Sequence, residues 1–193
     1  MRVRTAACAI LGNARSEHPD CLEKHVFGLT TLGFIHTVIS LVAMAAGIVC
    51  LLRDREISPR NRAGMTYLVM TVLTCLTGFG IFQHGGFGKP HLLGIITLVV
   101  LALAGIAGRR AFGRASAYVA TISYSLSFHF HVIPVVTETT TRLPLGAPLF
   151  TSPDDPALQA IIGACFVVFL LGVFAQVRRL LADAPLPMGV TAA

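Results

Sequence analysis

Residues 26–52 read VFGLTTLGFIHTVISLVAMAAGIVCLL, a predominantly apolar run without Asp, Glu, Lys or Arg. The hydrocarbon core of a bilayer is about 30 Å thick, and a helix rising about 1.5 Å per residue crosses it with roughly 20 residues. Lipid offers no hydrogen-bond partners, so a segment that spans it alone satisfies its peptide groups as a helix. The run therefore predicts a transmembrane helix.

Four further apolar segments follow, at residues 63–83, 91–108, 115–136 and 157–177. The composition agrees with several spans, because only 12% of the 193 residues are charged, about half the fraction of an ordinary soluble domain. We therefore predict an all-α integral membrane protein. Its bundle of about five transmembrane helices occupies residues 26–181, between tails at residues 1–25 and 182–193.

Short clusters of arginine between the apolar segments predict the orientation. In a five-span chain nine arginines fall on one side: Arg53, Arg55, Arg60, Arg62, Arg109, Arg110, Arg114, Arg178 and Arg179. Loops rich in Lys and Arg stay cytoplasmic, which places the C-terminus inside and the N-terminus outside a bacterial inner membrane. The alternative keeps the basic N-terminal tail inside and removes one weak span. Such clusters are not a continuous basic face, which argues against nucleic-acid binding.

Histidine is the most informative polar residue. Under this topology five histidines fall in the outer half of the bilayer or at its outer surface: His36, His84, His91, His129 and His131. Ionisable residues within a bilayer are costly and are functional candidates by default. Neutral imidazole is the commonest metal ligand and also holds haem iron. The pattern predicts an outer-side site for haem or a transition metal, copper or iron, although each histidine could instead be a hydrogen-bonding packing residue.

The spacing of these residues along the chain predicts which way their side chains project. His129 and His131 project roughly 200° apart on a regular helix, so either one faces the interior and the other a neighbour or lipid, or the helix opens at Pro134 and both serve. The segment from residue 135 to Pro156 is expected to be a capping loop. In it Glu138 and Arg142 are four residues apart and could pair.

The predicted ligands are thus His36, His84, His91 and His131, with His129 as an alternate. Glu138 is a further metal ligand, proton acceptor or imidazole partner, and Arg142 could meet a haem propionate. The second span has one polar face, expected to look inward: Tyr67, Met70, Thr74, Thr77, Ile81 and His84.

Residues 36–107 resemble families of small, uncharacterised bacterial multi-pass inner-membrane proteins with outer-side histidines. The likeness rests on His36 in the first span, the basic loop, Gly64-Met65-Thr66-Tyr67, and His84 with His91. Some related four-span families are linked to the assembly of haem-copper oxidases, so the resemblance implies a haem or metal role. This chain departs from them by a fifth span and by residues 128–144.

Three functions remain open. The first is electron transfer or respiratory cofactor handling at the histidine site. The second is a proton-coupled transporter of small molecules or ions, and the third is an accessory subunit without catalysis. The lipid bilayer is the expected surrounding, and a respiratory or other membrane complex and a second copy of the chain are candidate partners. No common hydrolase motif occurs, and the five cysteines lack metal or redox spacing.

Overall fold

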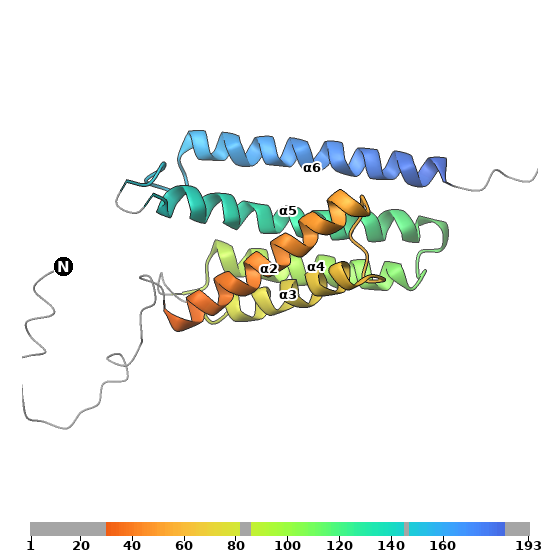
Figure 1. Cartoon of the computed structure of the whole chain (residues 1–193), viewed down its shortest axis with the longest axis horizontal. Coiled ribbons are helices and arrows are strands. Elements are labelled where there is room, and N and C mark those ends of the chain that lie inside the picture. Colours follow the sequence, from red (N-terminus) through yellow and green to blue (C-terminus); the bar gives the residue numbers. More distant parts are fainter. Residues whose placement is uncertain (1–29, 82–85, 145–146, 184–193) are drawn as a thin grey trace, which may run out of the picture.

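The computed structural model describes residues 30–81, 86–144 and 147–183. It is all-α, as predicted, and within these ranges it holds five long helices and one 3-10 turn (Figure 1). They are α2 (Thr31–Arg53), α3 (Arg62–Gly78), α4 (Lys89–Gly108), η2 (Gly113–Ala115), α5 (Ser116–Arg142) and α6 (Pro156–Ala182). The predicted tails lie outside the described residues, apart from the end of α6 and Asp183.

Four of these helices are long and apolar enough to cross a membrane: α2, α4, α5 together with η2, and α6. The other, α3, has 17 residues, at the lower limit of a spanning helix. It ends at Gly78 and not at the predicted residue 83. The part of the second span that carries His84 lies outside the described residues.

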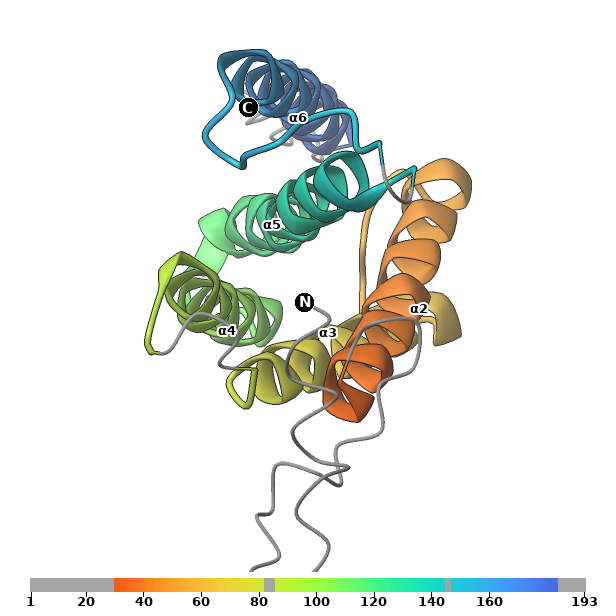
Figure 2. The same cartoon turned by 90° about the vertical axis from the view of Figure 1, so that its left-hand side faces the viewer.

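The helices alternate in direction, and the ends of α2, α4 and α6 meet the starts of α3 and α5 at one end of the molecule (Figure 1). The nine arginines that the sequence groups together belong to these ends and their loops. We call this the arginine end. Helices α2 to α5 surround a shared interior, whereas α6 packs on α5 alone among the helices (Figure 2).

Polar caps fix where the helices begin. The side chains of Thr30, Asn61 and Asp155 accept hydrogen bonds from the free N–H groups of the first turns of α2, α3 and α6. In α3 the donor is Gly64, at 2.8 Å from Asn61 Oδ1. A Cβ at Gly64 would lie 1.9 Å from the Ser58 carbonyl oxygen. The loop before α3 therefore folds back so tightly that only glycine fits there.

The end of α5 corrects one prediction. Residues 135–142 were expected in a capping loop, but α5 continues through Pro134 to Arg142. Proline removes a single helical hydrogen bond. The threonines that follow bond back to the helix, since Thr140 Oγ1 donates to the Val136 carbonyl at 2.8 Å and Thr141 Oγ1 to that of Thr137 at 2.7 Å. These bonds stay within the last turns of α5, which run on to Arg142.

Candidate functional site

The interior of the bundle divides into two regions. At the arginine end it contains an apolar cluster around Cys50, Ile57, Leu101 and Ala104. Buried hydroxyl residues of the first part of α5 lie in the same half: Ser116, Thr121, Ser123 and Ser125. From the middle of the bundle toward the opposite end, buried and partly buried side chains carry hydroxyl and imidazole groups. We call this second region the histidine half: the buried Tyr67, Thr71, Thr74, Ser127 and His131 and the partly buried His36 and Thr77. Buried polar groups need partners, and the partners here identify the site.

The side chain of His36 is held by α3. Its Nδ1 lies 3.0 Å from Thr77 Oγ1, and the Thr77 hydroxyl in turn lies 2.8 Å from the Leu73 carbonyl oxygen. A hydroxyl has one proton, so Thr77 donates either to a carbonyl of its own helix or to Nδ1 of His36. In the tautomer with Nδ1 protonated, His36 donates to Thr77, and its Nε2 carries the lone pair that could bind a metal or a proton.

A glycine makes room for this ring. A Cβ added at Gly78 would lie 3.2 Å from Cε1 of His36 and 3.7 Å from its Nδ1. That distance is tighter than an ordinary carbon contact. The His36 imidazole thus rests on the backbone of α3, where a larger residue would move it.

His131 faces the same interior from α5. The residue is 5% exposed, its ring centroid lies 6.2 Å from that of Tyr67, and it is an electrostatic neighbour of His36. Its Nε2 has no hydrogen-bond partner among the residues that the structure describes. The backbone carbonyl of Ser127, one turn earlier, lies beside the ring and leaves Nδ1 as the donor. With Nδ1 donating, the Nε2 of His131 carries a lone pair inside the bundle.

A hydrogen bond connects the two sides of this region. Tyr67 of α3 is completely buried, and its hydroxyl reaches Ser127 Oγ of α5 at 2.7 Å. Ser127 Oγ also donates to the Tyr124 carbonyl at 2.8 Å. The Tyr67 hydroxyl is therefore the donor to Ser127. The inward polar face predicted for the second span is confirmed for Tyr67 and Thr74.

The other predicted ligands lie elsewhere. His129 points to the opposite side of α5, where its ring stacks on Phe169 at 5.0 Å between centroids. Of the two arrangements open for His129 and His131, the structure thus has one inward and one against a neighbour. His91 lies at the start of α4, stacked on Phe87 at 5.3 Å, and α4 does not contact α2. His84 lies outside the described residues.

Glu138 and Arg142 form the predicted ion pair on α5. Both side chains are about half exposed, at 56% and 46%, so the pair contributes little to stability. Glu138 is also an electrostatic neighbour of His36. Within the described ranges no three His, Cys, Asp or Glu side chains gather closely enough to hold a metal ion. Among the predicted ligands that the structure describes, His36 and His131 are electrostatic neighbours of each other, and we call them the histidine pair.

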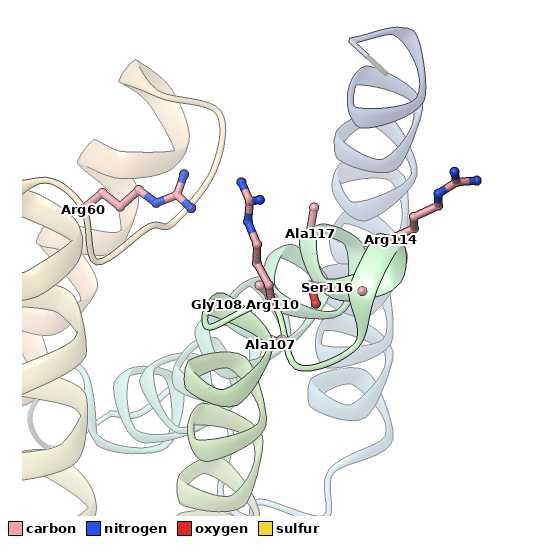
Figure 3. Close-up of a pocket in the computed structure, with 9 residues that line it drawn as sticks. Arg60, Ala107, Gly108, Arg110, Arg114, Ser116 and Ala117 are labelled. Carbon is pink, nitrogen blue, oxygen red and sulfur yellow. The ribbon is translucent and has the colours of Figure 1, made fainter. Parts of the chain in front are cut away.

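Sequence reasoning missed two features. One is the support of His36 by Thr77 and Gly78, although the three-and-four spacing of the polar face already included Thr77. The other is a cavity of about 640 Å³ at the arginine end, lined by Arg60, Arg110, Arg114 and Ser116 among others. Arg60 and Arg110 come from different loops and extend toward one another, whereas Arg114 points away (Figure 3). Two facing guanidinium groups can hold an anion.

Comparison with protein-family models, with curated proteins and with solved structures gives no match for this chain. The class of protein follows from the fold alone: an all-α chain with four described helices of membrane-spanning length and apolarity. The resemblance of residues 36–107 to small bacterial inner-membrane proteins stays a prediction.

Proposed function

We propose that this chain is a multi-pass protein of a bacterial inner membrane that binds haem iron between His36 and His131. The observation that carries the proposal is the placement of the two imidazoles, which are electrostatic neighbours. Nδ1 of His36 is engaged by Thr77, and the buried Nε2 of His131 has no hydrogen-bond partner among the described residues. Such anchoring of the second nitrogen is the usual way in which proteins orient a ligating histidine.

The number of histidines favours haem over a bare metal ion. Protein sites for zinc and similar ions ordinarily use three or four side chains, whereas one or two axial ligands suffice for haem iron. Within the described ranges no third His, Cys, Asp or Glu joins His36 and His131 in a cluster. Helix α2 packs mainly on α3 and only marginally on α5, so little helix packing opposes the insertion of a macrocycle between His36 and His131.

The position of the site favours a function on one side of the membrane. The described interior at the arginine end holds an apolar cluster and buried hydroxyl groups but no histidine, so it offers no imidazole for a second haem. With the arginine end in the cytoplasm, the histidine pair lies in the outer half of the membrane. Electron transfer on that side, or delivery of the cofactor to a respiratory complex, fits this arrangement.

The test is the visible spectrum and metal content of the protein purified in mild detergent, with and without added haemin. We expect a Soret band that is lost in His36→Ala and in His131→Ala. His129→Ala is the matched control, because this ring faces α6 and should leave the band unchanged. A protein that stays colourless after haemin is added would contradict the proposal, and a stoichiometric metal without a Soret band would favour a transition-metal site.

A proton-coupled transporter is the second candidate, and one observation favours it. The carboxylate of Glu138, half exposed at the end of α5, is an electrostatic neighbour of the buried His36, as a relay from water to an interior imidazole requires. Proteoliposomes with an internal pH dye test this function. Proton uptake that depends on Glu138 and His36, in a protein without haem, would replace the first proposal.

A further inference from the structure

A cavity of about 770 Å³ lies between α5, α6 and the end of α2. Its walls are mainly apolar and include Phe128 and Val132 of α5 and Ile161, Val168, Phe169 and Gly172 of α6. The volume is that of a pocket for a small organic molecule. The cavity is separate from the histidine pair, since neither His36 nor His131 lines it.

The packing of α6 explains why this space is open. α6 contacts α5 but no other helix, so nothing fills the angle between α6 and α2. Gln176 holds the spacing at the arginine end, because it accepts from Ser125 Oγ at 2.8 Å and donates to the Arg55 carbonyl at 2.9 Å. Arg179 Nη1 donates to the Asp54 carbonyl at 3.3 Å. These bonds tie α6 to the loop after α2 without closing the cavity.

The two ends of the cavity differ in chemistry. The α6 residues that line it recur every three or four positions from Ile161 to Arg179, a stripe about 27 Å long. An acyl chain of one leaflet needs about half of the 30 Å hydrocarbon core, so the apolar stripe is long enough for it.

At the arginine end the lining includes Arg55 and Arg179. The Arg55 side chain has no ion-pair partner within the described ranges.

We propose that this cavity is the binding site of one anionic phospholipid. The phosphate lies between Arg55 and Arg179, and one acyl chain follows α6 past Gly172 toward Ile161. Basic pockets between transmembrane helices at the cytoplasmic surface suit such headgroups, and the apolar stripe is suited to the chain. The proposal needs the protein to be in a membrane but does not depend on haem.

The experiment is native mass spectrometry of the detergent-purified chain with phosphatidylglycerol and, separately, phosphatidylcholine of the same acyl chains. We expect one phosphatidylglycerol to be retained and at least tenfold less phosphatidylcholine. The variant Arg55→Gln/Arg179→Gln should weaken phosphatidylglycerol binding about thirtyfold, from two arginine contacts near the surface. The variant Arg60→Gln/Arg110→Gln removes the same charge at the other cavity and should bind normally.

A pair of glycines on α6 tests the cavity itself. Neither Gly172 nor Gly163 has an atom within 4 Å of an added Cβ, but only Gly172 lines the cavity. Gly172→Phe should abolish retention and Gly163→Phe should not. The proposal fails if these two variants bind alike, if phosphatidylcholine is retained equally, or if Arg60→Gln/Arg110→Gln weakens binding as much as Arg55→Gln/Arg179→Gln. Because lipid is counted on the protein with or without haem, failure here is distinct from failure of the haem site.

Discussion

The two regions of the bundle interior are built from different residues. The arginine end contains an apolar cluster around Cys50, Ile57, Leu101 and Ala104. The histidine half contains hydroxyl and imidazole groups whose partners come from other helices, as in the pairs Tyr67–Ser127 and His36–Thr77. Inside lipid each polar group must be satisfied within the protein. The apolar cluster at the arginine end needs no such partners, whereas the position of each polar side chain in the histidine half depends on the group it bonds.

The largest expected effect comes from removing the imidazole of His131, whose buried Nε2 has no hydrogen-bond partner among the described residues. We expect His131→Leu to abolish the Soret band while leaving the haem-free protein as stable as the wild type or more so. The reason is that an unpaired buried polar atom costs about 1–3 kcal/mol, which leucine removes. Absorbance and thermal unfolding of both proteins measure this. A strongly lowered melting temperature in His131→Leu would indicate a packing role instead.

The arginine end is most sensitive at Gly64. Gly64→Ala places a Cβ against the Ser58 carbonyl, so the backbone of the loop must move, at a cost of about 3 kcal/mol. Thermal unfolding in detergent should show the loss, and bound haem should keep its spectrum. Gly105→Ala on α4 is the control, because its Cβ would meet open space. Equal melting temperatures for the two variants would contradict the tight fold of this loop.

Removing Thr77, which supports His36, should weaken haem binding less than removing a haem-binding histidine. Thr77→Val removes the hydroxyl that bonds with His36 Nδ1 and should weaken haem binding about 10- to 100-fold, as loss of a ligand's hydrogen-bond partner usually does. Haemin titration measures the affinity. Thr97→Val on α4 is a matched control, since that hydroxyl bonds only within its own helix, to Leu93. If Thr97→Val weakens haem binding as much as Thr77→Val does, the loss does not come from the hydrogen bond between Thr77 and His36.

A smaller effect is expected from the contact that joins α3 to α5. Tyr67→Phe removes one buried hydrogen bond to Ser127, which keeps its bond to the Tyr124 carbonyl. Interhelical hydrogen bonds in membranes average about 0.6 kcal/mol, so the melting temperature should fall slightly. A Tyr67→Phe/Ser127→Ala cycle isolates the coupling. A coupling near zero would show that the two helices do not depend on this bond.

The smallest effect concerns acid stability at the arginine end. Arg53, together with Asn61, holds the pKa of the Asp54 carboxyl below its usual value. A carboxyl with a lowered folded-state pKa stabilises above its unfolded pKa, and the contribution disappears as pH falls through the folded value. The wild type should therefore lose a little stability below the ordinary carboxyl range, and Asp54→Asn should lose less. The prediction would be wrong if the melting temperatures of the wild type and Asp54→Asn changed by the same amount between pH 3 and pH 6.

Much of the fold could be predicted from the sequence, because apolar runs of about 20 residues leave the backbone only the helix in lipid. The roughly 200° between His129 and His131 likewise limited them to two arrangements. The course of α5 beyond Pro134 could not be predicted, since a proline can end a helix or be tolerated within one, depending on the helices packed around it. Nor could the partner of His36, because that depends on which helices pack together.

The sequence by itself determined the number and type of the helices, their alternation and the grouping of the arginines, since these depend on local hydropathy and charge. Only the tertiary structure decided that His36 and His131 face one interior while His129 turns to α6. It also decided that Thr77 and Gly78 support the His36 ring and that α6 leaves a cavity beside α5. Such features arise where side chains from distant segments meet, and their geometry depends on packing that no single segment contains.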